Sequence, residues 1–395
     1  MKRTGLYAIF AAAVLFLSGS LLWAESQARI VRLSLVEGSV ELDRATGQGF
    51  EKAIQNMPIT QGMRLRTDSG SNAEVEFESG STLRLIGNSS VSFGRLSLSD
   101  DGAKLTAVNV EEGTAYFDVK KKSHDEFAIS FAGREIRVTH SSHLRVEVSD
   151  SRVEVAMFNG EAEIVGDRDA RLKKDETLAF NRSEEVNYDV AKGVSDEPSD
   201  SWDKQRDDYI NSYAQQSQVA NSPYSYGMSD LAYYGSYYND ASYGWVWRPY
   251  GVAYNWDPFY NGAWVWYPGF GYTWVSAYPW GWAPYRYGRW TWLPAYGWVW
   301  QPGYWNNWWR GPVCVNAPVS YIPPRPPRHH DRGVVWVGTP PVGWPRGPHH
   351  PADGDNDHDR RINIKTHDRD TAGSRQTMTA TTTPANGSDA GSARR

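Results

Sequence analysis

The sequence is poor in cysteine, in net charge and in long apolar runs. Cys314 is the single cysteine among 395 residues, which excludes an internal disulfide and any site built from several thiolates. Lys and Arg number 41 against 46 Asp and Glu, and the net charge of -5 offers no basic excess for nucleic acid. Only the N-terminus holds an apolar run near membrane length. We therefore expect no nucleic-acid partner and no disulfide scaffold.

The N-terminal run has the order of an export signal. Two basic residues precede an apolar core from Leu6 to Leu17, and small residues follow as far as Ala24. This pattern predicts a secretory signal peptide at residues 1–24, cleaved after Ala24 or Ala28. An uncleaved anchor stays open, because the run approaches the ~20 residues that a bilayer needs. We expect a periplasmic or secreted protein without a membrane span once the signal is removed.

Alternation of apolar and polar residues dominates residues 29–181. The run "AEVEFES" begins at Ala73 and "RVEVAMF" begins at Arg152, with Val, Ile or Phe at alternate positions. Such alternation indicates strands with one buried face. Turn pairs such as Asn159-Gly160 separate the runs and favour hairpins. The sequence predicts an all-β roll or sandwich over residues 29–181.

Several motifs in this range have a family pattern. They are "VEGSV" from Val36, "GMRLRTDSGSNAEVEFESGSTLRL" from Gly62, "EEGTAYFDV" from Glu111 and "FNGEAEI" from Phe158. Over about residues 33–164 the chain resembles the FecR-type extracytoplasmic domain. In FecR regulators this domain takes part in signalling between an outer-membrane receptor and a sigma factor, so the resemblance implies binding rather than catalysis. Because few residues precede the apolar core, we expect no cytoplasmic anti-sigma segment and a different extracytoplasmic role.

Two groups of side chains in this range invite a catalytic interpretation. Paired serines lie between His140 and His143, but neighbouring strand residues point to opposite faces, and no Gly-x-Ser-x-Gly elbow is present. Glu74, Glu76 and Glu78 alternate along one strand face, which we expect to be solvated. The sequence therefore indicates no catalytic residue, no cofactor and no metal, and we expect a protein that is not an enzyme.

A polar, acidic stretch at residues 182–200 predicts a linker. A helix is expected next, at residues 201–219. Four apolar side chains recur there at helical spacing: Trp202, Tyr209, Ile210 and Tyr213. This stripe is expected to pack on one of the two modules that flank the helix.

Tryptophan is concentrated in one region, residues 224–310. The stretch "WDPFYNGAWVWYPGFGYTW" from Trp256 aligns without a gap to "WAPYRYGRWTWLPAYGWVW" from Trp282, with eight identities. A partial copy, "YGWVWRP", begins at Tyr243. Fixed spacing of this kind predicts a repeat of short strands that Gly and Pro interrupt. We expect a small aromatic-rich β repeat domain at residues 224–310.

The rings have two possible uses. Each buried Trp or Tyr removes roughly 150–250 Å² from water, so cohesion comes first. Rings left on the surface would bind a protein partner, a Pro-rich segment of a partner or of the chain's own tail, or a cell-wall glycan. Arg286 and Arg289 are expected over ring faces. The candidate surface comprises Trp256, Trp264, Trp266, Trp274, Trp282, Trp290, Trp292 and Trp300, with the two arginines.

The same region resembles a second family. The motifs "DLAYYGSY" from Asp230, "YGWVWRP" and "WGWAPYRYGRW" are similar to an uncharacterised Trp/Tyr/Pro/Gly repeat domain of exported bacterial proteins, over about residues 202–305. That domain often follows a FecR-like module. The family has no assigned activity, so this resemblance implies location and domain boundaries alone.

Residues 311–395 are rich in Pro, His and charge, and we expect a disordered tail. The acidic run at Asp353 departs from a calcium loop, because His358 stands where Gly is needed. Adjacent histidines at His329-His330 and His349-His350 are poor preorganised ligands.

These features favour an exported non-catalytic protein that mediates protein–protein or cell-envelope interaction, with signal sensing as a further option. A carbohydrate- or peptidoglycan-binding module that uses exposed Trp and Tyr is the alternative. An envelope-acting hydrolase is a third.

Overall fold

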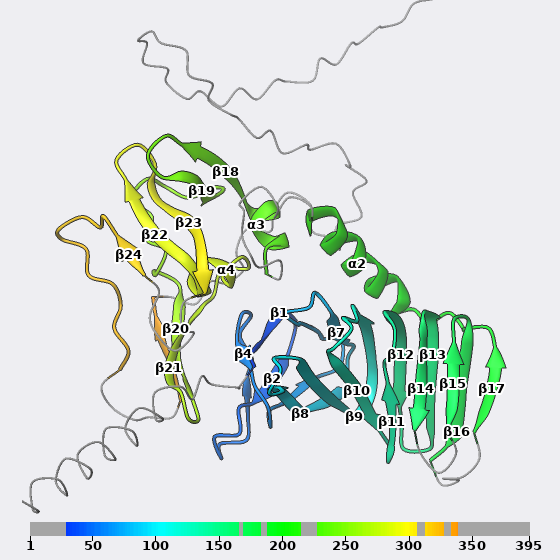
Figure 1. Ribbon diagram of the computed structural model, residues 1–395. Helices are drawn as coiled ribbons and strands as arrows, with labels where there is room; N and C mark the ends of the chain where they lie inside the picture. Colours follow the sequence, from blue (N-terminus) through cyan, green and yellow to red (C-terminus); the bar gives the residue numbers. More distant parts are fainter. Residues whose placement is uncertain are drawn as a thin grey trace, which may run out of the picture.

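A computed structural model of the chain describes residues 29–165, 169–182, 188–214, 227–305, 313–327 and 333–338. A larger module of strands lies beside helix α2 and a smaller module rich in aromatic residues, hereafter the aromatic module (Figure 1). The prediction of an all-β protein with a linking helix is confirmed. Helices in the described ranges are α2 (Asp200–Ala214), α3 (Ser229–Tyr234) and α4 (Ala283–Arg286). The predicted signal peptide, the run at Asp353 and both histidine pairs lie outside the described residues.

The larger module is made of two sheets that share one long strand. Its strands are β1 (Val31–Glu37), β2 (Val40–Asp43), β3 (Phe50–Lys52), β4 (Pro58–Ile59), β5 (Arg64–Thr67), β6 (Asn72–Glu76), β7 (Thr82–Leu85), β8 (Ser89–Leu98), β9 (Lys104–Val119), β10 (Glu126–Phe131), β11 (Arg134–Arg137), β12 (Ser142–Val148), β13 (Arg152–Asn159), β14 (Glu161–Val165), β15 (Ala170–Lys173), β16 (Glu176–Asn181) and β17 (Asp189–Lys192). One sheet runs β4-β1-β6-β7-β9-β12-β13-β16-β17, and we call it the helix-side sheet because α2 covers it. The opposite sheet runs β3-β2-β5-β8-β9-β10-β11-β14-β15.

Aliphatic side chains fill the space between these sheets. Val75, Leu83 and Ile129 are completely buried there, at alternate positions of their strands. Strand β9 joins the sheets because its first half pairs with β8 and β10, and its second half pairs with β7 and β12. The period of two in the sequence therefore corresponds to one face per strand packed in the core.

The predicted linker at residues 182–200 is wrong in part. Strand β17 lies inside it and pairs antiparallel with β16, from Glu176 opposite Lys192 to Ala179 opposite Asp189. All four β17 side chains are exposed, so this edge strand is held by its backbone pairing with β16. Its sequence has no alternation of apolar and polar residues from which a strand could be predicted. Helix α2 begins one residue before the predicted start, and residues 215–219 of the predicted helix lie outside the described ranges.

The aromatic module contains short strands in two sheets. They are β18 (Gly235–Asp240), β19 (Gly244–Pro249), β20 (Gly262–Tyr267), β21 (Gly271–Ser276), β22 (Tyr287–Leu293), β23 (Gly297–Trp305), β24 (Cys314–Val315) and β25 (Val334–Val337). The orders are β18-β19-β23-β22-β24 and β21-β20-β25. The two aligned stretches form matching hairpins, in which Trp264 faces Trp274 and Trp290 faces Trp300.

Disorder throughout residues 311–395 is also wrong, because two pieces of this segment complete the sheets of the aromatic module. Strand β24 adds in parallel to β22, and β25 adds antiparallel to β20. Between them, the Tyr321 ring packs on Trp298 at a centroid distance of 4.8 Å. The Tyr321 hydroxyl donates to Asp257 Oδ1 at 2.9 Å. Aromatic faces and open strand edges thus order a segment whose composition predicts disorder.

No helix in the described ranges has both the length and the apolar character needed to cross a membrane.

Candidate functional site

Most of the predicted tryptophan surface is core. Trp264, Trp274, Trp282, Trp290 and Trp300 are buried, and Trp256, Trp266 and Trp292 are half-buried. The expectation that these eight rings form an exposed platform is therefore wrong for five of them. Facing rings on paired strands lie close enough to fill the centre of a small module, and burial of apolar area favours this use over exposure.

Trp280 is the centre of that core, although it has no counterpart in the aligned repeat. Its ring stacks on Tyr278 at 4.7 Å and meets Trp247 edge-on at 5.1 Å. It also lies 5.8 Å from Trp256 and 6.2 Å from Trp290. Its side chain is fully buried. Apart from its aromatic residues and its glycine, the "YPWGW" loop has no sequence feature that marks Trp280 as the centre of a core.

The two candidate arginines differ from each other. Arg286 is buried, its guanidinium lies 5.2 Å from the centroid of the Trp282 ring, and it donates to the Trp274 carbonyl at 2.7 Å. Arg289 is exposed and donates from Nε to Gln301 at 2.7 Å. The predicted cation–π position therefore fits Arg286, which supports the core rather than a ligand.

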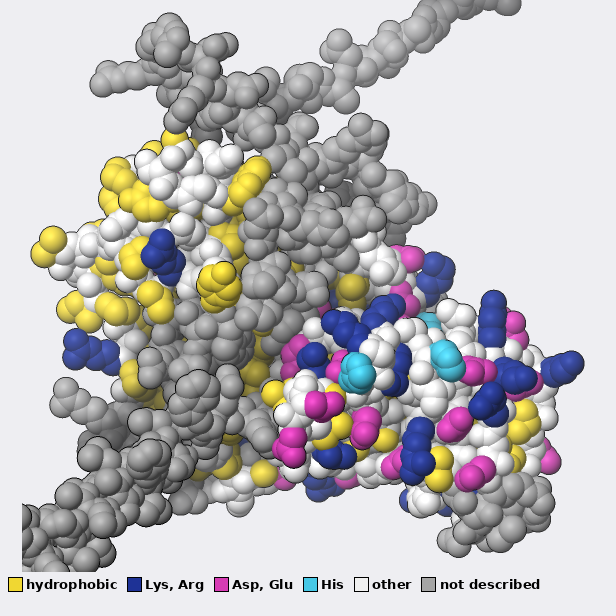
Figure 2. All heavy atoms as spheres, in the orientation of Figure 1, with side chains coloured by type: hydrophobic (Ala, Val, Ile, Leu, Met, Phe, Trp, Pro, Cys, Tyr) yellow, Lys and Arg dark blue, Asp and Glu magenta, His cyan; other side chains and the backbone are white. Residues whose placement is uncertain are grey.

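Exposed apolar side chains collect on the aromatic module. Ten large hydrophobic residues of the described ranges are exposed, and Val190 is the one outside this module. The other nine are Tyr250, Tyr254, Tyr260, Tyr304, Val313, Val319, Ile322, Val335 and Trp336. Figure 2 shows hydrophobic side chains spread over this module, while mixed charges cover the larger one. We call these nine residues the apolar surface; the sequence did not single them out.

Buried polar contacts join the two modules. Arg32 on β1 donates to a carboxylate oxygen of Asp230 on α3, to Glu76 Oε2 at 3.3 Å and to the Pro279 carbonyl at 3.0 Å. The Tyr209 hydroxyl of α2 donates to the other oxygen of Asp230 at 2.6 Å. The larger module, α2 and the aromatic module thus meet at one buried carboxylate, which couples their positions.

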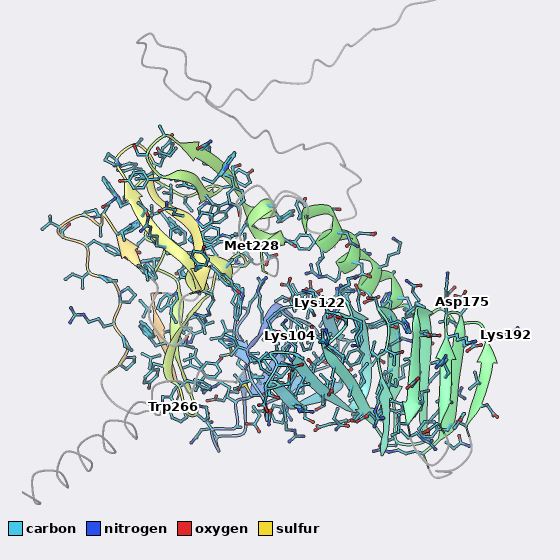
Figure 3. The ribbon with its side chains drawn as sticks, viewed as in Figure 1. Lys104, Lys122, Asp175, Lys192, Met228 and Trp266 are labelled. Carbon is cyan, nitrogen blue, oxygen red and sulfur yellow. The ribbon has the colours of Figure 1, made fainter. Side chains whose placement is uncertain are left out.

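The same boundary continues along the β20–β21 hairpin. Asn56 Nδ2 donates to the carbonyls of Ser276 and Tyr278, at 3.1 and 2.7 Å. Arg44 donates to the Trp266 carbonyl, and the Tyr267 hydroxyl donates to the Pro58 carbonyl. Met228 and Trp266, labelled in Figure 3, lie on the aromatic-module side of this boundary.

Charged side chains hold α2 on the helix-side sheet. Arg84 on β7 reaches Asp203 and Asp207 of the helix at 2.6 and 2.7 Å. Arg206 of the helix reaches Glu74 on β6 at 2.8 Å. At the start of the helix, Asp200 accepts from Arg145 on β12 and from the Tyr116 hydroxyl. The helix therefore presents charges to the larger module. Two members of its predicted aromatic stripe, Tyr209 and Tyr213, pack on Tyr233 of the aromatic module.

The expectation of a solvated glutamate face is wrong for Glu74 and Glu76, which are 1% and 8% exposed. Burial acts to raise the pKa of Glu74, but Arg206 and Arg84 hold it well below its usual value. Burial raises the pKa of Glu76 to about 7, against the opposing effect of Arg32. A strand pattern shows that one face is polar, but it does not show that a helix and a second module will cover that face.

Ser142 and His143, which lie in the stretch that invited a catalytic interpretation, have other partners in the structure. Ser142 Oγ donates to the carbonyls of His140 and Glu161, so it is not paired with a histidine ring. His143, Asp203 and Asp207 place ligand-type atoms within 4.8 Å of one another. Arg84 occupies one oxygen of each of these carboxylates, so they act as ion-pair partners, and we assign no metal to them.

Comparison with known families identifies both modules. The FecR protein family matches residues 63–163, and a family of unknown function, DUF6600, matches residues 228–327. The chain carries a FecR domain and a DUF6600 domain. Both resemblances are thereby confirmed. The DUF6600 match extends past residue 310 and includes the ordered segment with β24.

Two solved structures match part of this chain. Both are of a proposed anti-sigma factor from Parabacteroides distasonis ATCC 8503, at 1.65 and 2.50 Å resolution, with 17% identity and a TM-score of 0.31. Each alignment covers 35% of this chain and 63% of that protein. Comparison with curated proteins gives no match.

Proposed function

We propose that this chain is an exported, non-enzymatic protein that binds a protein partner in the cell envelope. The apolar surface of the aromatic module contacts the partner. The FecR domain and α2 hold that surface in a fixed orientation through the buried contacts of Arg32, Asn56 and Asp230. A role in signal sensing or regulation fits the FecR domain.

The observation that carries this proposal is the uneven distribution of exposed apolar residues, nine of ten of which lie on the aromatic module. Exposed apolar patches on soluble proteins usually mark interaction sites. Export rests on the basic and apolar pattern of the first 24 residues.

Site-specific photo-crosslinking tests the surface. A photoreactive phenylalanine at Tyr304 or Trp336 is expected to give a defined adduct with an envelope protein in intact cells. The same group at Arg137, exposed on the larger module, is the matched control and should give none. Equal adducts from all three positions, or none from any, would contradict the proposed surface.

Cell fractionation tests location separately. The intact chain should be recovered in the extracytoplasmic fraction, and a chain that lacks residues 1–28 should stay in the cytoplasm. Cytoplasmic recovery of both forms would overturn export without affecting the surface.

Carbohydrate binding is the second candidate, because four of the exposed residues are tyrosines and one is Trp336. Rings of this kind stack on sugars, but the burial of five predicted tryptophans leaves a smaller platform than the sequence suggested. A crosslinked adduct at Tyr304 that disappears on muramidase digestion would favour peptidoglycan over a protein partner.

A further inference from the structure

His143 lies where α2 meets the helix-side sheet. Its Nε2 is 2.7 Å from Asp203 Oδ2, and its Nδ1 is 3.9 Å from Asp207 Oδ2. The other oxygens of both aspartates are taken by Arg84. The imidazole also packs on Phe158, with ring centroids 5.1 Å apart. His143 is thus the sheet residue that faces the free oxygens of the helix aspartates.

The charges around His143 do not balance while it is neutral. Three carboxylates and two guanidinium groups form one connected cluster: Glu74, Asp203, Asp207, Arg84 and Arg206. One negative charge is left over. On the neighbouring strand β9, Asp118 lies opposite His143, and Lys120 pairs with it at 2.6 Å.

A single proton on His143 brings the connected cluster to zero. A divalent cation beside neutral His143 would leave it with a surplus positive charge next to Arg84. An unbalanced buried charge is costly, so the protonated imidazole is the form that fits the docked helix.

We propose that α2 is a proton-dependent latch, which stays closed on the helix-side sheet while His143 is protonated and loosens when His143 loses its proton. The same helix carries Tyr209, which binds Asp230 at the boundary with the aromatic module. Loosening of α2 therefore weakens the coupling between the FecR and DUF6600 domains.

The direction of the pH effect follows from the neighbours. Burial acts to lower the pKa of His143, but the close contact with Asp203 and the charges of Asp203, Asp207 and Asp118 raise it above its usual value. A raised pKa in the docked state means that the stabilisation is complete below about pH 6.5 and is lost as the pH rises through the docked value. Asp200, whose pKa Arg145 and Tyr116 lower, stays charged over this range and holds the start of the helix.

Hydrogen exchange on the full-length chain tests the latch. Protection of α2 amides, corrected for intrinsic exchange rates, is measured at pH 6.0 and pH 8.5. In the wild type it should fall by about tenfold for each unit by which docking raises the pKa. His143→Gln should show low protection at both pH values. His143→Lys keeps a positive charge and should remain protected at pH 8.5.

His140→Gln is the matched control, because His140 is exposed and pairs with Glu161 away from α2. It should behave as the wild type. Equal α2 protection at both pH values in the wild type, or a wild-type pH response in His143→Gln, would overturn the proposal.

Loss of protection in β12 and β13 of a His143 variant would mean that the substitution disturbs the sheet itself. The test then uses the wild type alone. The His143 ring resonance must then titrate at the pH where α2 protection falls, and separate midpoints would refute the latch.

Discussion

The longest strand of the larger module, β9, has 16 residues, whereas the longest in the aromatic module, β23, has nine. The larger module buries Val, Leu and Ile between two sheets. The aromatic module buries seven tryptophans to less than 2% exposure. Short strands that Gly and Pro interrupt offer few core positions and lose much backbone entropy on folding. A larger ring at each core position offsets that loss.

If the aromatic module depends on its buried rings, the largest loss of stability should follow a substitution at the centre of the ring cluster. Trp280→Ala should lower the free energy of unfolding of the aromatic module by ~3–5 kcal/mol, because the cavity lies among four rings. Urea unfolding followed by fluorescence measures the loss. Trp336→Ala, at a ring that is 40% exposed, should change it by about 0.5 kcal/mol or less. Equal losses would break the distinction between core and surface rings.

The boundary between the modules should be nearly as sensitive. Arg32→Ala leaves Glu76 and Asp230 buried without their guanidinium, at a cost of about 3 kcal/mol. Calorimetry should then resolve two unfolding transitions where the wild type shows one. Arg66→Ala removes an exposed pair with Glu41 and should cost about 1 kcal/mol or less without splitting the transition. A single transition in Arg32→Ala would mean that the modules are coupled elsewhere.

Close ring packing should also make one glycine intolerant of a methyl group. A Cβ at Gly262 would lie 2.4 Å from the Trp274 ring and 2.7 Å from the Val275 carbonyl oxygen. Gly262→Ala should therefore cost about 1–3 kcal/mol. Gly333→Ala meets no atom within 4 Å and should be near neutral in the same thermal melts. If Gly262→Ala leaves the melting temperature unchanged, the Trp274 ring must be able to move aside for the added methyl group.

The smallest effect should depend on pH. Because the pKa of Glu76 is raised to about 7, its contribution to stability is complete below its unfolded pKa and is lost as the pH rises through 7. Glu76→Gln cannot ionise and should gain about 1 kcal/mol over the wild type at pH 8.5. At pH 4.0, below the usual glutamate pKa of 4.5, the two should melt together. An equal gain in the free energy of unfolding at both pH values would mean that the substitution acts through packing rather than through ionisation of Glu76.

Alternation predicted the strands of the larger module, and the spacing of Trp, Gly and Pro predicted the hairpins of the other. Both signals are local, so the sequence alone is enough to show them. What covers a polar face is not local. Glu76 lies on the strand where the pattern puts it, but one of its buried partners is the backbone N–H of Gly227, 151 positions along the chain.

The predicted tryptophan surface was wrong for five of its eight rings for the same reason, because burial by distant parts of the chain is not a local property. Trp264 and Trp300 belong to a visible repeat, but their burial follows from how the hairpins pack, and the repeat does not specify that. The charges of α2 could have been noticed: Asp200, Asp203, Arg206 and Asp207 share one side of a helix. Their partners on β6, β7 and β12 become apparent only when the sheet is assembled.

Strand β25 has a practical consequence for anyone who expresses part of this chain. It covers the free side of β20 although it lies beyond residue 330. A recombinant fragment that stops at residue 310 would leave that backbone edge open, together with the ring of Trp298 that Tyr321 shields. Open strand edges recruit other strands, so such a fragment would form aggregates, and a soluble one should continue at least to Gly338.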